Sequence, residues 1–252
     1  MDYLQLIAAI FVGATAGYLG SFMVLRRMAL VGDALSHVAL PGIALALMFN
    51  FSPPIGAFAA LFGGIIVVWL LENKTKIATE ALIGLIFTVS LSIGLLITPD
   101  EELLEALFGD ISTISLFEGL VTIFLSILVL LVMKKISKSF MLSTISNDLA
   151  KSVKIRTSLV NFGYLMLVAV IVALGIKTVG TLLMGALVVI PAIASKNVSG
   201  GLSSYVKAST FFGALSGAIG VLLAFKYGFA PGPMVVLASA GIFLITLVFK
   251  KN

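Results

Sequence analysis

The chain has 252 residues, of which 60% are hydrophobic and 11% are charged, and its mean hydropathy is +1.22. About a quarter of the residues in an ordinary soluble domain are charged, so this composition excludes a soluble globular protein. The chain has no cysteine, which excludes disulfides and thiolate metal sites. Apolar runs continue along the whole length without a soluble linker, and we expect residues 1–252 to form a single membrane domain.

The apolar runs predict nine helices long enough to cross a hydrocarbon core about 30 Å thick. They cover residues 4–25, 28–49, 54–71, 80–98, 116–133, 158–176, 179–195, 207–225 and 231–249. The expected fold class is therefore an all-α polytopic membrane protein with about eight or nine transmembrane helices and one short helix on the cytoplasmic side.

The first and eighth runs each contain a GxxxG motif, at residues 13–17 and 213–217. Glycines at this spacing share one helix face and let a second helix approach closely. With 24 glycines in the chain, such matches also arise by chance. We expect both motifs to pack helices within the chain.

The second run contains the only histidine, and His37 follows Asp33 by four residues. This spacing places both side chains on one face of a helix. A carboxylate oxygen and a neutral imidazole nitrogen suit divalent zinc, manganese or iron. Two ligands do not complete a metal site, so the remaining ligands would be carbonyl groups near Pro41 and Gly42, water, or groups elsewhere in the chain.

A structural role for Asp33 and His37 is the alternative. Asp33 would then pair with Arg26 or Arg27 near the inner interface, and His37 would hydrogen-bond a carbonyl group. A charged side chain at the centre of a membrane helix costs ~2.5–3.5 kcal/mol on insertion scales, so one of the two roles must offset that cost. The residues alone leave both open.

Two polar loops follow. The outer loop, residues 99–115, carries Asp100, Glu101, Glu102, Glu105 and Asp110. Its acidity predicts either a solvated loop or a surface that attracts cations or a partner protein.

The inner loop, residues 143–157, predicts a short helix on the membrane face. Ser146 or Asn147 can cap it, Asp148 lies in its first turn, and Lys151 comes late, an order that complements the helix dipole. An ordinary basic cytoplasmic loop is the alternative.

The basic residues set the orientation. With nine spans and a cytoplasmic C-terminus, fourteen of the sixteen Lys and Arg residues lie inside, and only Lys177 and Lys226 lie outside. This bias follows the positive-inside rule and predicts an external N-terminus. The net charge of +5 therefore reflects membrane topology rather than nucleic-acid binding.

The chain lacks several catalytic motifs. It has no G-x-x-x-x-G-K-[ST] sequence, so any ATP that drives transport is bound by another chain. It also has no G-x-S-x-G elbow and no His-Glu-x-x-His pair, which argues against an intramembrane hydrolase. We expect no catalytic residue.

Residues 20–37 read GSFMVLRRMALVGDALSH, which resembles the signature of the zinc/manganese family of ABC importer permeases. Three more stretches resemble motifs of that family in the right order: LFGD at 107–110, NDLAK at 147–151 and VGTLLMGALVVIPA at 179–192. The resemblance covers nearly the whole chain. One departure is Lys154, because a glycine is usual before the isoleucine at this point.

The resemblance implies a permease in a prokaryotic cell (inner) membrane. Two copies would form the pathway, two cytoplasmic ATP-binding subunits would dock inside, and an external metal-binding protein would deliver the ion. The cargo would be Zn2+ or Mn2+, with Fe2+ as a third candidate, and no cofactor would be bound permanently. The implied metal contacts are Asp33 and His37, and Asp110 belongs to the outer docking loop. The implied ATPase contacts are Asn147, Asp148, Leu149, Ala150, Lys151 and Val153.

Two other functions remain open at this stage. One is a stand-alone secondary metal transporter, coupled to protons through Asp33 and His37. The other is an ABC permease for a metal chelate, against which the Asp33–His37 pair argues because it suits a bare ion.

Overall fold

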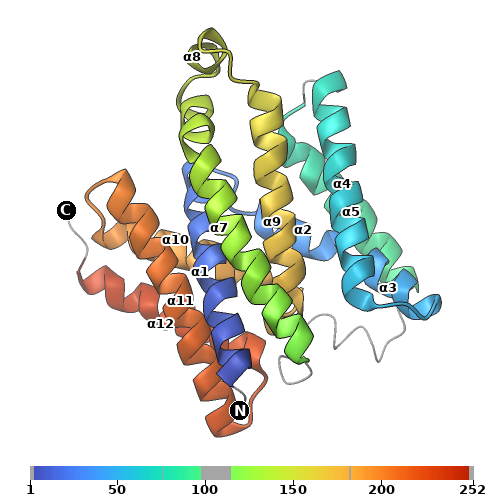
Figure 1. The fold of residues 1–252 in the computed structure, drawn as a ribbon, viewed down its shortest axis with the longest axis vertical. Helices are drawn as coiled ribbons and strands as arrows, with labels where there is room; N and C mark the ends of the chain where they lie inside the picture. The colour runs from blue at the N-terminus through green and yellow to red at the C-terminus, as the bar shows by residue number, and fades with distance from the viewer. Residues whose placement is uncertain (1–2, 76, 98–114, 182, 250–252) are drawn as a thin grey trace.

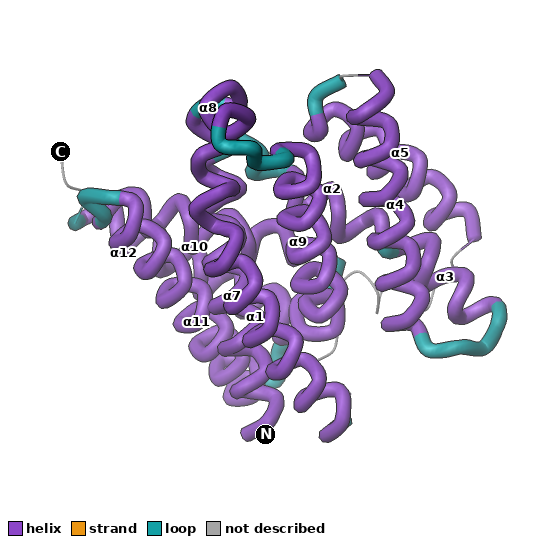
Figure 2. The backbone as a smooth tube through the Cα atoms, turned by 45° about the horizontal axis from the view of Figure 1, so that its top comes forward, coloured by secondary structure: helices purple, strands orange, loops and turns teal. Residues whose placement is uncertain are grey.

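The computed structural model describes residues 3–75, 77–97, 115–181 and 183–249 (Figure 1). Within these ranges every regular element is a helix and none is a strand (Figure 2). The helices are α1 (Tyr3–Leu25), α2 (Val31–Val38), α3 (Leu40–Met48), α4 (Pro53–Thr75), α5 (Thr79–Ile97), α7 (Leu116–Ile145), α8 (Asn147–Ser152), α9 (Thr157–Val179), α10 (Met184–Val198), α11 (Leu202–Tyr227) and α12 (Pro231–Val248). The predicted all-α fold class is confirmed.

Eight helical segments in the described residues are long and apolar enough to cross a membrane, with α2 and α3 together counted as one, Val31–Met48. The seventh predicted run became α10, which has only 15 residues. It starts at Met184 rather than at 179, because α9 continues to Val179 and Gly180 then ends it with φ of 87°. The chain is a multi-pass membrane protein.

Other predicted boundaries were wrong as well. The third span ends at Thr75 rather than at 71, and the eighth begins at Leu202 rather than at 207. The second span begins at Val31 rather than at 28, because residues 26–30 form turns and Arg27 has φ of 61°. The fifth span ends at Ile145 rather than at 133. With 30 residues, α7 is about 45 Å long and therefore exceeds the hydrocarbon core by several turns.

The two GxxxG motifs pack against each other, as expected. A Cβ atom at Gly13 would overlap the carbonyl oxygen of Gly213, and one at Gly17 would overlap that of Ser209. The backbones of α1 and α11 therefore meet directly, and Ser209 adds a 2.6 Å hydrogen bond to the Gly17 carbonyl oxygen. This close contact fixes α1, from which the chain turns into α2.

The helices form two groups with α9 between them (Figure 1). One group contains α1, α7, α10, α11 and α12, and the other contains α3, α4 and α5. Helix α2 crosses from one group to the other, because it contacts both α10 and α5. Helix α8 lies at one end of the molecule and α1 begins at the opposite end (Figure 1). We call these the α8 end and the N-terminal end.

Candidate metal site and coupling segment

Asp33 and His37 occupy the first and last turns of α2. The acid near the start of α2 complements the helix dipole. Pro41, near the start of α3, has no N–H to continue the helical hydrogen bonds, so the run breaks into α2 and α3. Gly42 has a separate role, because a Cβ atom there would overlap the carbonyl oxygen of Gly56 in α4.

Three neighbouring segments hold α2 in place. The Ser36 hydroxyl lies 2.6 Å from the carbonyl oxygen of Thr181, which lies in a turn after the end of α9. Gly185 leaves room for Asp33, since a Cβ atom there would overlap Asp33 Cβ. The His37 ring lies 5.5 Å from the Phe87 ring of α5. Non-helical backbone at membrane depth is tolerated where protein surrounds it. Helix α2 is part of the protein that surrounds the turn at Thr181.

Two buried polar atoms near this point have no hydrogen-bond partner within the described chain: His37 Nδ1 and Thr181 Oγ1. Only 8% of His37 is exposed, whereas Asp33 is half-buried and interacts electrostatically with His37. Buried polar groups are nearly always paired, so an unpaired imidazole nitrogen is a candidate ligand for something the chain alone does not supply. The Asp33–His37 face therefore combines two donor types suited to a divalent ion.

The alternative pairing of Asp33 with Arg26 or Arg27 is not found. All three Arg26 side-chain hydrogen bonds go to residues of α7 and α9. Among the described residues, the single ion pair joins Lys177 to Glu118. No group of three or more His, Cys, Asp or Glu residues surrounds a possible ion in that part of the chain. Further ligands must therefore come from backbone, water or another source.

The predicted short helix of the inner loop is α8. Ser146 caps it by accepting a hydrogen bond from the Leu149 N–H at 3.3 Å. Leu149 and Val153 are 57% and 60% exposed, so the helix presents apolar side chains away from the bundle. Asn147, Asp148 and Lys151 are exposed as well, whereas Ala150 is fully buried. Ala150 therefore anchors α8 from the inside and offers no surface to a partner.

Lys154 adopts the left-handed conformation, with φ of 60°. This conformation costs an ordinary residue roughly 1–2 kcal/mol and suits glycine. The resemblance to the zinc/manganese permeases led us to expect glycine at this position. The backbone turn after α8 is therefore formed in spite of the substitution.

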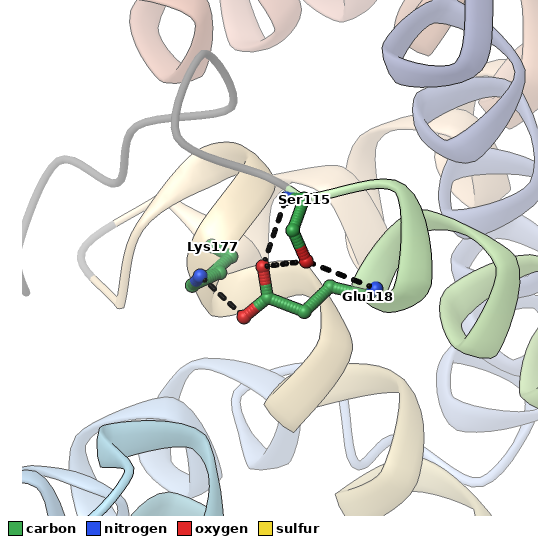
Figure 3. Close-up of polar contacts among 3 residues, drawn as sticks. All are labelled: Ser115, Glu118 and Lys177. Carbon is green, nitrogen blue, oxygen red and sulfur yellow. Dashed lines mark hydrogen bonds and ion pairs between the residues drawn. The ribbon is translucent and has the colours of Figure 1, made fainter.

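The acidic outer loop, with Asp100, Glu101, Glu102, Glu105 and Asp110, lies outside the described residues. Directly after it, Ser115 and Glu118 form a capping box at the start of α7 (Figure 3). Glu118 also accepts a 2.6 Å hydrogen bond from the Lys177 ammonium group at the end of α9. The Ser-x-x-Glu spacing is typical of a capping box and could have predicted the start of α7. No pattern near Glu118 in the sequence indicated its ion pair with Lys177.

A second polar cluster was not expected at all. It surrounds Arg26 at the α8 end and lines a cavity of about 470 Å³. Burial lowers the pKa of the Arg26 guanidinium, whereas the nearby Tyr164 and Glu72 raise it. The residues that line the cavity come from six helices or their ends, α1, α4, α5, α7, α8 and α9, and no sequence motif relates them.

Comparison with known proteins gives a consistent result. The ABC 3 transport family matches residues 3–250. A manganese transport system membrane protein, MntC, of Listeria innocua is 27% identical over 251 residues, which cover 98% of this chain and 90% of that protein. A chelated iron transport system membrane protein, YfeD, of Yersinia pestis is 28% identical over 250 residues, covering 97% and 84%.

The solved structure of PsaBC from Streptococcus pneumoniae, in complex with Fab, has a similar fold. Its TM-score is 0.84 at 27% identity, and the match covers 98% of this chain and 91% of that chain. The similarity therefore covers nearly the whole chain.

Proposed function

Because the chain belongs to the ABC 3 transport family, we propose that it is the membrane permease of an ATP-driven importer for a divalent transition-metal ion. Its role is transport, and ATP is hydrolysed on a separate subunit. The observation that carries the metal assignment is that His37 Nδ1, on the same helix face as Asp33, is buried and has no hydrogen-bond partner among the described residues. A neutral imidazole and a carboxylate together suit manganese, zinc or ferrous iron.

Asp33 and His37 are the proposed contacts for the ion. Thr181 supports the proposal, because its carbonyl group lies beside α2 and its hydroxyl has no partner within the ranges that the structure describes. Backbone and hydroxyl oxygens are ordinary ligands for hard divalent cations. The site would bind an ion weakly enough to release it if some ligands were contributed only in one conformation of the transporter.

Helix α8 is the proposed ATPase contact. Its exposed surface combines apolar Leu149 and Val153 with Asn147, Asp148 and Lys151. An exposed apolar pair within a polar rim is the usual composition of a protein–protein contact. If α8 lies in the cytoplasm, the α8 end is the inner face, the N-terminus lies outside and the acidic outer loop with Asp110 faces the delivery protein.

A second copy of the chain is the proposed partner within the membrane. The similarity to PsaBC and to transporter subunits supports a homodimeric pathway. Manganese is the first cargo to test, because MntC is named for it. The name of YfeD makes iron the second, and a chelated form of iron tests the chelate alternative.

Uptake into vesicles tests the proposal. The permease is reconstituted with its ATPase and delivery protein, and ATP-dependent entry of Mn2+, Zn2+, Fe2+ and chelated iron is measured. Entry of at least one bare ion only when the ATPase subunit and ATP are present is the expected result. Entry driven by a proton gradient without ATPase would instead indicate a secondary transporter.

A further inference from the structure

The Arg26 side chain links the turn after α1 to α7 and α9, the helices before and after α8. Its Nε donates to Thr144 Oγ1 at 2.8 Å and its Nη2 donates to Ser143 Oγ at 2.7 Å, both near the end of α7. Its Nη1 donates to Asn161 Oδ1 at 2.6 Å, near the start of α9. The guanidinium also lies 3.8 Å from the centre of the Phe140 ring. The two helices on either side of α8, α7 and α9, therefore both hydrogen-bond to one charged group. We call the end of α7 and the start of α9 the α8 stems.

Asn161 extends this cluster to α4 and α5. While its Oδ1 accepts from Arg26, its Nδ2 donates to Glu72 at 3.4 Å and to Thr79 at 3.2 Å. The Thr79 hydroxyl donates to Glu72 at 2.6 Å. The Asn161 amide thus lies between a cation and an anion that form no ion pair with each other in the described structure. Removing Arg26 would leave the Asn161 Oδ1 atom without this donor.

The backbone after Arg26 leads into α2 by a short, hydrogen-bonded path. Met28 N–H donates to the Met23 carbonyl at 2.9 Å, and Val31 N–H donates to the Met28 carbonyl at 3.1 Å. Asp33 follows within the first turn of α2. A displacement of the α8 stems must therefore either break the Arg26 hydrogen bonds or pull on the turn that holds α2.

We propose that Arg26 is a positioning residue that transmits movement of α8 to the Asp33–His37 helix. This rests on the proposed function, since it requires α8 to be moved by an ATPase. The guanidinium suits the role because its donors form a planar, rigid fork and its hydrogen bonds are charge-assisted. A lysine has a compact ammonium group and cannot reach Ser143, Thr144 and Asn161 with the same geometry.

The neighbouring arginine is the matched control. Arg27 is exposed and carries the same charge one residue later, and its side chain makes no hydrogen bond or ion pair in the described part of the chain. The variants R26Q and R26K are therefore compared with R27Q in the reconstituted permease–ATPase complex, with Mn2+ as the probe. Three quantities are measured: Mn2+ transported per ATP hydrolysed, Mn2+ affinity of the complex, and its melting temperature.

We expect R26Q and R26K to keep Mn2+ affinity within about twofold and to keep hydrolysing ATP, while Mn2+ transported per ATP falls roughly tenfold. R27Q keeps the ratio of the unaltered complex. An unchanged ratio in R26Q, a rescued ratio in R26K, or an equal loss of uptake and hydrolysis would overturn the inference. The last outcome indicates a role in assembly alone.

A milder variant keeps the test decisive if R26Q does not assemble. The double variant S143A/T144V retains Arg26 and removes two of its acceptors, and we expect roughly a threefold fall in Mn2+ per ATP. An unchanged ratio would overturn the inference. If the unaltered complex shows no ATP-dependent Mn2+ uptake, the proposed function fails for manganese and the inference fails with it, whereas normal uptake with unaffected variants contradicts the inference alone.

Discussion

The α8 end and the Asp33–His37 face of α2 are both polar regions in an apolar chain, yet they differ in how their polar groups are paired. Around Arg26, three donors find three acceptors, and Asn161 passes the network on to Glu72 and Thr79. On α2, His37 Nδ1 is buried without a partner in the described chain. A satisfied network holds helices together, whereas an unsatisfied group is free to bind something else.

The largest effect should come from removing the unsatisfied groups. D33N and H37A should each reduce metal uptake to background, because each deletes one of two proposed protein ligands, while the complex still assembles. Uptake and size-exclusion profiles are measured together. E80Q, an exposed acid at the start of α5, is the control and should transport normally. Normal transport by H37A, with misfolding of D33N, would favour a structural role for both residues.

The next largest effect concerns the exposed side of α8. Replacing Leu149 and Val153 with lysine should separate ATP hydrolysis from uptake, because a charged pair cannot be buried in an apolar contact. Loss of one interface anchor typically costs about 2 kcal/mol or more, so ATPase affinity should fall at least roughly thirtyfold. The exposed Leu202, also replaced with lysine, serves as the control. Undiminished coupling in the double variant would remove α8 from the ATPase interface.

A smaller effect is expected at the outer loop. Neutralising Asp100, Glu101, Glu102 and Asp110 together should weaken delivery-protein binding by roughly tenfold at low salt and less at high salt, because exposed charges are screened. Affinity is measured by titration at several ionic strengths. Equal affinities for the variant and the unaltered protein at every salt concentration would mean that the loop is merely solvated.

The smallest effect is a gain in stability. K154G should raise the free energy of unfolding by about 1 kcal/mol or less, because glycine relieves the left-handed strain at this position but also makes the unfolded chain more flexible. A thermal melt of the detergent-solubilised protein measures the change. K151G, inside α8, is the contrasting variant and should lower the melting temperature. A lower melting temperature for K154G would contradict the account of this turn.

Features that depend on residues close together in the chain could be predicted from the sequence. Hydropathy located the spans, and the order of Ser146, Asp148 and Lys151 predicted α8 with its cap. The start of the second span was wrong because the left-handed turn at Arg27 has no local signature for a residue of this type. The end of α7 was missed because its later lysines indicated the membrane interface, although a helix can continue beyond it.

The Arg26 cluster could not be predicted, because its partners lie 117, 118 and 135 residues away in the chain. The Asp33–Arg26 pair that proximity suggested is absent for the same reason, since tertiary contacts gave Arg26 better partners. The spacing of Asp33 and His37 did indicate a shared helix face, and the structure adds that His37 is buried there. What completes a metal site around them is not encoded in local spacing.

Anomalous scattering from a manganese-loaded complex tests the central claim most directly. Diffraction data collected at the manganese absorption edge locate the ion without reference to any side chain. We predict a peak within coordination distance of both the Asp33 carboxylate and His37 Nδ1, and no such peak in D33N. A strong peak in the membrane-spanning region far from both side chains would contradict the assignment of α2 as the metal-binding helix.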